Sequence, residues 1–224
     1  MTILDSLALP PADYFPERQH KDLIVLHHTV GASAASTVAS WRQNARRIAT
    51  AYLIDRDGAI YRAFPDDAWA FHVGLKSTRT VDRRSIGIEI ASEGPLEERD
   101  GGFYSFGRIS LATRFNGTVY DHGCDWRGCR HFAAYTRAAL ESVYALVEKL
   151  LTIYSIPRQM PAPPGDVVAP DGNAGEALYQ DYRGVLAHCH LRPDKTDVHP
   201  GFPWQELALR CRLQATEAAM PAAR

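Results

Sequence analysis

The chain has 224 residues, 46% of them hydrophobic, which is enough apolar material for one globular domain with a sizeable core. The formal charge of −1 leaves no basic excess to neutralise phosphates, so the composition argues against a nucleic-acid binder and gives no support for docking on an anionic membrane. No stretch approaches the roughly 18 consecutive apolar residues that cross a bilayer, and we therefore expect no membrane insertion.

Residues 1–20 contain prolines and lack periodicity, and we expect an arm that lies over the domain. They have no cationic head and no long apolar run, so they do not resemble a secretory signal. We therefore expect the chain to be cytoplasmic as synthesised, with leaderless delivery to the periplasm or cell wall as the alternative. In a reducing compartment its four cysteines are expected to be free thiols, although Cys124 and Cys129 could bridge a loop.

Strand and helix signals alternate along the first half of the chain. The β-prone run at 22–29 predicts a strand, and residues 33–48 have helical apolar spacing with Ser33 as a candidate N-cap. Two β-prone runs around an Asp-Gly turn at 52–61 indicate a hairpin. Residues 85–90 are almost entirely apolar and predict a central strand.

The second half begins with an irregular segment. Residues 93–130 are rich in glycine and aromatic residues, which favours an inserted loop or hairpin outside the core. An apolar stripe at 135–154 predicts the clearest helix, which Pro157 ends. The proline-rich residues 157–172 favour a long connection, and a final helix is expected from about 203 to 215.

This order of elements predicts a single α/β domain with a central mixed β-sheet flanked by helices. The domain is expected to span residues 21–215, with the insertion at about 93–130 and a C-terminal tail at 216–224.

Two adjacent histidines end the first predicted strand. Side chains alternate across a strand, so His27 shares a face with Leu23 and Val25, whereas His28 points to the opposite face. At most one of the two is therefore expected to face a given metal ion. Taken alone, a histidine at a strand end is more often a hydrogen-bonded packing residue than a ligand.

The segment from His188 to Gly201 is loop-like, yet it concentrates three histidines, two aspartates and a lysine. Together with His27, it supplies the two imidazoles and one carboxylate that a catalytic zinc site uses, with a fourth position open to water. A polar surface loop is the competing interpretation.

Glu89 is a carboxylate inside the apolar run at 85–90. Burying a carboxylate among isoleucines is costly unless the group is paired or functional. We interpret Glu89 as a general base whose pKa is raised by apolar neighbours. A solvent-facing glutamate on an edge strand is the alternative.

Taken in order, these segments resemble the amidase-2 family, which includes bacterial N-acetylmuramoyl-L-alanine amidases, phage endolysins of the T7 lysozyme kind and peptidoglycan recognition proteins. The similarity covers about residues 20–92 and 132–210. Five motifs carry it, namely Ile24-Val-Leu-His-His-Thr29, Tyr52-Leu-Ile-Asp-Arg-Asp-Gly58, Ala70-Phe-His-Val-Gly74, Ser85-Ile-Gly-Ile-Glu89, and His188 to Asp197 followed by Phe202-Pro-Trp204.

The resemblance implies that residues 21–215 form an amidase-2-like catalytic domain with one zinc ion per chain. It implies hydrolysis of the amide bond between N-acetylmuramic acid and L-alanine in peptidoglycan or muropeptides. The family's metal ligands fall on His27, His188 and Asp197. Lys195 matches the lysine that polarises the scissile carbonyl, and Glu89 matches the acid/base glutamate of the bacterial branch.

The resemblance also places His72 at the rim of the substrate cleft, and we expect His72 and Trp69 to contact substrate. A buried, hydrogen-bonded histidine and a core tryptophan are the alternatives.

The chain departs from the family pattern near its site. The tyrosine of endolysins and recognition proteins falls on Thr50, so Glu89 must act without it. The Lys-Thr-Asp unit lies one residue nearer to His188 than in many bacterial relatives, and His199 interrupts the usual Asp-Pro-Gly. His190 and His199 therefore remain rival ligands, and His28 is expected to pack in the sheet.

Three biological settings fit these features: recycling of soluble anhydro-muropeptides, phage lysis, and injection into rival cells as an effector. An effector would bring a cognate inhibitor or immunity protein as partner. Two other functions stay open. One is a peptidoglycan-binding module without catalysis, and the other is a zinc amidase or peptidase that acts on another acyl-peptide.

Overall fold

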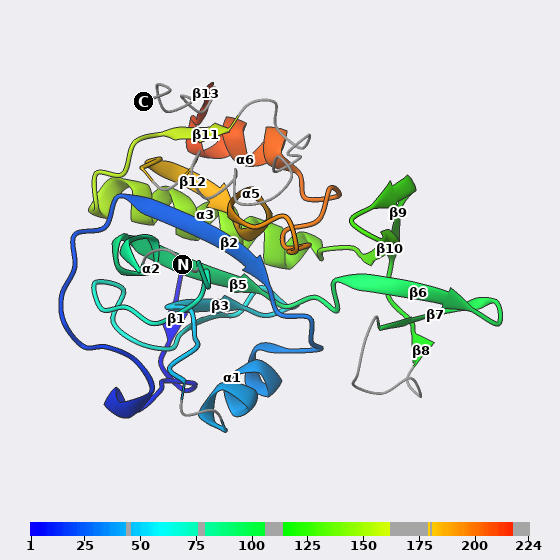
Figure 1. The fold of residues 1–224 in the computed structure, drawn as a ribbon, viewed down its shortest axis with the longest axis horizontal. Coiled ribbons are helices and arrows are strands. Elements are labelled where there is room, and N and C mark those ends of the chain that lie inside the picture. The colour runs from blue at the N-terminus through cyan, green and yellow to red at the C-terminus, as the bar shows by residue number, and fades with distance from the viewer. Residues whose placement is uncertain (44–45, 76–78, 106–113, 162–178, 180, 217–224) are drawn as a thin grey trace.

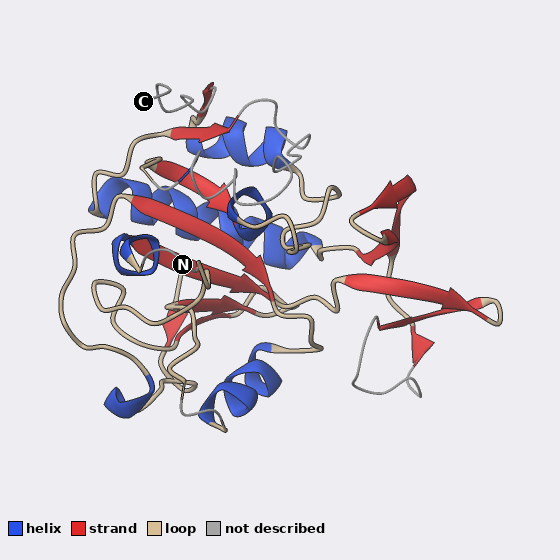
Figure 2. Ribbon diagram, in the orientation of Figure 1, coloured by secondary structure: helices blue, strands red, loops and turns tan. Residues whose placement is uncertain are grey.

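The computed structural model describes residues 1–43, 46–75, 79–105, 114–161, 179 and 181–216. Figure 1 shows a body built on one large sheet, with a second sheet projecting from one end. Helices lie beside the large sheet, as Figure 2 shows by colour. The predicted α/β fold with a central mixed sheet is confirmed. Within the described ranges, no helix combines the length and apolar character needed to span a membrane.

The large sheet has the strand order β1-β4-β3-β5-β2-β12 in the described part of the chain. The β3–β4 pair is antiparallel and the other pairs are parallel, so the sheet is mixed. Its strands are β1 (Ile3–Leu4), β2 (Leu23–His28), β3 (Tyr52–Ile54), β4 (Ile60–Arg62), β5 (Ser85–Ile90) and β12 (Gly184–Ala187). The predicted strands and hairpin are confirmed, whereas β1 and β12 were not expected.

Side chains alternate on the central strands, so the two faces of the large sheet differ. Ile24 and Leu26 belong to the larger core, which also contains the isoleucines of β5 and the apolar stripe of α3 (Arg137–Ile153). Leu23 and Val25 belong to a smaller apolar cluster on the other face. The register of β2 with β5 pairs His27 with Glu89, which places both polar side chains on this second face.

The first and last predicted helices end earlier than expected. The hydroxyl of Ser33 accepts from the Ser36 N–H at 3.1 Å and starts a helix that ends at Arg42 rather than near residue 48. The last helix ends at Cys211 because Arg212 adopts a left-handed φ of 52°. The helices not yet given bounds are η1 (Pro11–Asp13), α1 (Ala34–Arg42), α2 (Thr80–Arg84), α5 (His188–Leu191) and α6 (Trp204–Cys211).

Two short strands lie near the proline-rich connection and near the end of the described chain. β11 (Gln159–Pro161) pairs in parallel with β13 (Gln214–Thr216), where the sequence predicted connection and helix. The remainder of the expected connection, residues 162–172, lies outside the described residues, as does most of the expected tail.

The insertion is more regular than expected, because its described residues, 95–105 and 114–133, form an antiparallel sheet with the order β8-β7-β6-β10-β9. We call it the inserted sheet. Its strands are β6 (Pro95–Arg99), β7 (Gly102–Ser105), β8 (Arg114–Phe115), β9 (Val119–Trp126) and β10 (Cys129–Ala133). Most of its side chains are exposed or half-buried, so its strands lack the apolar alternation that marks a half-buried sheet. It projects beyond the carboxyl ends of β2 and β5 (Figure 1).

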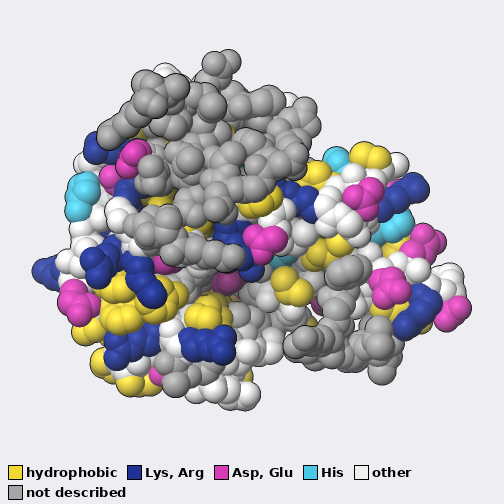
Figure 3. Space-filling view, in the orientation of Figure 1, with side chains coloured by type: hydrophobic (Ala, Val, Ile, Leu, Met, Phe, Trp, Pro, Cys, Tyr) yellow, Lys and Arg dark blue, Asp and Glu magenta, His cyan; other side chains and the backbone are white. Residues whose placement is uncertain are grey.

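The N-terminal arm is attached to the body by backbone pairing and aromatic stacking. β1 pairs with β4, and Phe15 exchanges two backbone hydrogen bonds with Trp69. The rings of Phe15 and Trp69 stack with centroids 3.9 Å apart, and the guanidinium of Arg47 lies 4.4 Å from the Phe15 centroid. On the face shown in Figure 3, basic side chains gather around apolar ones at the lower left.

Candidate metal centre

The three predicted ligand residues meet at the carboxyl end of β2. Nδ1 of His27 lies 3.1 Å from Nδ1 of His188, and each of these nitrogens lies 3.0 Å from Oδ2 of Asp197. All three side chains are buried. Tetrahedral zinc with bonds of about 2.0–2.1 Å holds its ligand atoms about 3.3 Å apart. The observed spacing is therefore close to that of three corners of such a site.

Parallel strand pairing brings these ligands together. β12 pairs with β2, and His188 follows β12 directly as the first residue of α5, so it lies beside His27 although 161 residues separate them. The chain then turns back, and the Cys189 N–H donates to the carbonyl of Asp197 at 2.7 Å. The segment expected to be loop therefore starts with one helical turn.

Hydrogen bonding at its far nitrogen orients the His188 ring. Nε2 lies 2.8 Å from the carbonyl oxygen of Val73, which can only accept, so Nε2 must carry the proton. In a neutral ring, Nδ1 then keeps a free lone pair. Val73 is itself held in place, because Oδ1 of the buried Asp82 accepts from the backbone N–H groups of His72 and Val73, each at 2.9 Å.

A short relay orients the His27 ring in the same way. The hydroxyl of Ser85 donates to the Val81 carbonyl at 2.5 Å, so it accepts from Nε2 of His72 at 2.8 Å. Nδ1 of His72 is then the acceptor for the Nε2–H of His27 at 2.9 Å. His27 therefore also presents a bare Nδ1 towards Asp197.

These assignments leave three electron pairs facing one another without a proton between them. Burial lowers the pKa of His27 to about 4, which keeps the ring neutral. Burial alone would raise the pKa of Asp197, but its interactions with His188 and His27 hold that pKa well below its usual range. Two imidazole nitrogens and a carboxylate oxygen suit zinc. The residues therefore fit the expected metal.

Glu89 lies beside His27 on the neighbouring strand, on the same face of the sheet. Its Oε2 is buried and has no hydrogen-bond partner in the described part of the chain. Burial, together with the negative charge of Asp197, raises the pKa of Glu89 well above its usual range, while the charge of Lys195 opposes the shift. A buried carboxylate oxygen without a partner beside such a site is suited to accept a proton.

Lys195 lies in the same segment as two of the ligands, two residues before Asp197. Its side chain is half-buried, and its charge lowers the pKa of both His27 and Glu89. The structure therefore places a cation close to the three ligands and to the carboxylate.

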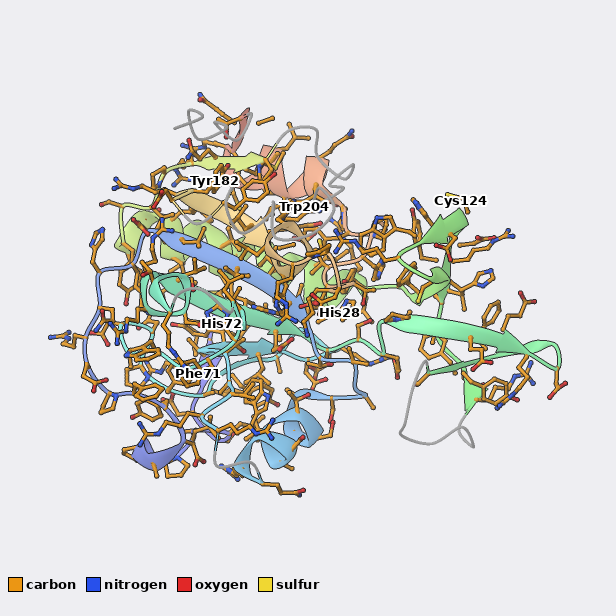
Figure 4. The ribbon with its side chains drawn as sticks, in the orientation of Figure 1. His28, Phe71, His72, Cys124, Tyr182 and Trp204 are labelled. Carbon is orange, nitrogen blue, oxygen red and sulfur yellow. The ribbon has the colours of Figure 1, made fainter. Side chains whose placement is uncertain are left out.

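The two predicted substrate contacts lie deeper than expected. His72 lies behind His27, and hydrogen bonds engage both of its ring nitrogens; Figure 4 labels it in the interior of the body. Trp69 is only 5% exposed, and its ring lies between Phe15 and the guanidinium of Arg83. Burial argues against a sugar contact for Trp69, and both ring nitrogens of the half-buried His72 already have partners within the protein. We interpret His72 as a support of the metal centre and Trp69 as a packing residue of the arm.

A glycine in β5 makes room for this support. A Cβ atom on Gly87 would lie 2.7 Å from Cγ2 of Thr50 and 3.1 Å from Nδ1 of His72. A glycine inside a central strand indicates the close approach of another group. In the sequence, this glycine indicates that another group approaches β5 closely at Gly87.

The rival histidines have other partners. Nδ1 of His190 accepts from the Ala187 N–H at 2.7 Å. His199 is fully buried, stacks on Tyr135 with centroids 4.5 Å apart, and has both ring nitrogens engaged by backbone groups. His28 faces the opposite side of the sheet, where its Nδ1 lies 3.0 Å from the hydroxyl of Tyr135. None of the three belongs to the group formed by His27, His188 and Asp197.

We expect His72→Ala to weaken zinc binding by about 10- to 100-fold while the fold persists, because His27 loses the acceptor that fixes its tautomer. Titration with zinc against a chromophoric chelator measures the change. The exposed His20 provides the control, and His20→Ala is expected to bind zinc as the unmodified chain does. Equal affinities for the two variants would contradict the role given to His72.

A mixed sheet that brings two histidines, an aspartate and a buried glutamate together at one end offers the set of side chains that metal-assisted hydrolases use. The sequence matches the profile of the N-acetylmuramoyl-L-alanine amidase family over residues 17–202. The chain belongs to this family and is an enzyme of this type. No curated protein sequence matches the chain.

Solved structures of amidases share the fold. PlyL superposes with a TM-score of 0.55 at 17% identity over 96% of this chain and 99% of PlyL. The amidase LysC from Clostridium intestinale URNW gives 0.51 at 17% identity over 96% and 99% of the two chains. AmiD from E. coli gives 0.53 at 21% identity and covers 89% of this chain but 60% of AmiD.

Proposed function

We propose that the chain is a zinc-dependent amidase that hydrolyses the bond between the lactyl group of N-acetylmuramic acid and L-alanine in peptidoglycan or muropeptides. In this proposal His27, His188 and Asp197 hold one zinc ion per chain. Glu89 is the general base and acid, and Lys195 is the electrostatic stabiliser. The convergence of three lone pairs beside an unpaired carboxylate carries the proposal.

The residues divide the reaction between them. When bound at such a site, zinc lowers the pKa of a coordinated water and polarises a carbonyl. Glu89 takes a proton from the attacking water and returns it to the leaving L-alanine nitrogen, so that a C–O bond replaces the C–N bond. Lys195 stabilises the negative charge that develops on the carbonyl oxygen. His72 and the carbonyl of Val73 keep the ligand rings oriented.

A soluble fragment is a suitable first substrate. AmiD was solved with anhydro-N-acetylmuramic acid-L-Ala-D-gamma-Glu-L-Lys. The family match and the shared fold support the use of the same class of compound here, alongside intact sacculi.

The decisive experiment is incubation of the zinc-loaded protein with an anhydro-muropeptide and with sacculi, followed by mass spectrometry of the products. We expect a free peptide that begins with L-alanine, together with the peptide-free sugar. Chelation should stop its release, and added zinc should restore it. Substrate binding without cleavage would instead indicate a recognition module, and cleavage at another bond would indicate a different amidase or peptidase.

A further inference from the structure

One side chain of the inserted sheet contacts the segment that carries two of the three proposed ligands. Arg127 lies at the turn between β9 and β10, where its φ of 56° is followed by a φ of 80° at Gly128. Its Nη1 donates to the carbonyl of Arg192 at 3.0 Å and also to the carbonyl of Lys195. Its Nη2 donates to the carbonyl of Cys189 at 3.0 Å.

All three carbonyls belong to the segment at 188–197, which carries two of the three ligands and Lys195. Cys189 follows His188, and Lys195 lies two residues before Asp197, so the guanidinium joins both ends of the segment. A guanidinium is planar and permanently charged, and its donors diverge in a fixed fork, so one side chain can hold several carbonyls in a single geometry. Lysine, with one compact ammonium group, cannot reproduce that fork.

Aromatic packing joins the inserted sheet to the residues that follow Asp197. The ring of His199 stacks on Phe132 of β10, with centroids 4.9 Å apart and planes inclined by 17°. Tyr120 of β9 lies on the same histidine, with centroids 5.7 Å apart. The inserted sheet therefore contacts the chain on both sides of the Asp197 ligand.

We propose that Arg127 is a positioning residue for the metal centre. It holds the segment at 188–197 in the conformation that presents His188 and Asp197 to His27 and keeps Lys195 beside them. The inserted sheet is thereby part of the structure that supports the active site. This inference rests on the proposed function only for the identity of the ligands.

The test compares Arg127→Ala and Arg127→Lys with Arg130→Ala, which removes an arginine of β10 that forms an exposed ion pair with Asp121. Zinc affinity is measured by competition with a chromophoric chelator, and ligand geometry by the absorption spectrum of the cobalt-substituted protein. We expect zinc affinity to fall by about 10- to 100-fold in Arg127→Ala, by a smaller factor in Arg127→Lys, and not at all in Arg130→Ala. The cobalt spectrum should change only in the Arg127 variants.

Circular dichroism of the metal-free proteins separates positioning from global folding. If Arg127→Ala does not fold, Arg127→Lys, which keeps the charge, provides the measurement. Zinc affinity and a cobalt spectrum equal to those of the unmodified chain in a folded Arg127 variant would overturn the proposal. Neither measurement requires cleavage of a muropeptide. An unmodified chain that binds zinc but releases no peptide would therefore contradict the proposed function and leave the role of Arg127 open to the same test.

Discussion

Replacement of His188 by alanine is expected to abolish zinc binding at micromolar metal and to reduce amide hydrolysis by more than about 100-fold. Loss of a residue that only supports a metal ligand typically costs about 10- to 100-fold, so loss of a ligand itself should cost more. The reason is geometric. His188 supplies one of the two imidazole nitrogens in the group. Without it only His27 and Asp197 remain, whereas a zinc site with one open position needs three protein ligands. Metal content after dialysis and the rate of peptide release from an anhydro-muropeptide measure the two effects.

His190 provides the matched control, since it lies two residues further along and was a rival ligand by sequence. In His190→Asn the amide oxygen can replace Nδ1 as acceptor for the Ala187 N–H. We expect this variant to retain zinc and most of its activity. Loss of zinc from His190→Asn together with its retention by His188→Ala would reverse the assignment.

The second large effect is expected for Glu89→Gln, which should leave zinc bound but slow turnover by about 100-fold or more, because the amide cannot take the proton from water. The two side chains have nearly the same shape, so folding should be unaffected. The measurements are zinc content, thermal unfolding and kcat on a soluble muropeptide. A Glu89→Gln enzyme with normal turnover would remove the general base from the mechanism.

The pH profile provides an independent check on Glu89. Burial raises the pKa of this carboxyl above its ordinary value, and the base acts only when it is ionised. Activity should therefore be present above the raised pKa and fall as the pH drops through it, so the acid limb of kcat/KM lies at a higher pH than for an exposed glutamate. The charge of Lys195 lowers this pKa. Lys195→Ala should therefore move the acid limb to higher pH, in addition to slowing turnover by about 100-fold.

The sequence was most informative where alternation and capping rules apply. Strand parity separated His27 from His28 because side-chain direction in a strand follows from position alone. The apolar face of α3 and the Ser33 cap of α1 also follow local rules, and the structure confirms them. The three expected ligands lie together, and motif order had placed them there.

What the sequence left open depends on contacts between distant segments. The supporting role of His72 was not visible in the sequence, because its partners His27 and Ser85 lie on β2 and β5, in other parts of the chain. The packing role of Trp69 was likewise not visible, because Phe15, which stacks on its ring, lies far away in the sequence. Arg127 lies in an exposed hairpin, where an arginine carries no signal of its own. No local pattern encodes such pairings.

The long separation between His27 and His188 has a consequence for how the chain tolerates its insertion. The metal centre closes a loop of 161 residues, and the inserted sheet lies entirely within that loop. The entropy of loop closure grows only with the logarithm of length, so removing a stretch the size of this sheet would change the closure free energy by about 0.25 kcal/mol. The added chain length therefore has almost no effect on the free energy of loop closure, and a large insertion between β5 and β12 is tolerated in this respect. The main requirement on such an insertion is that its two ends fit the positions of the flanking elements.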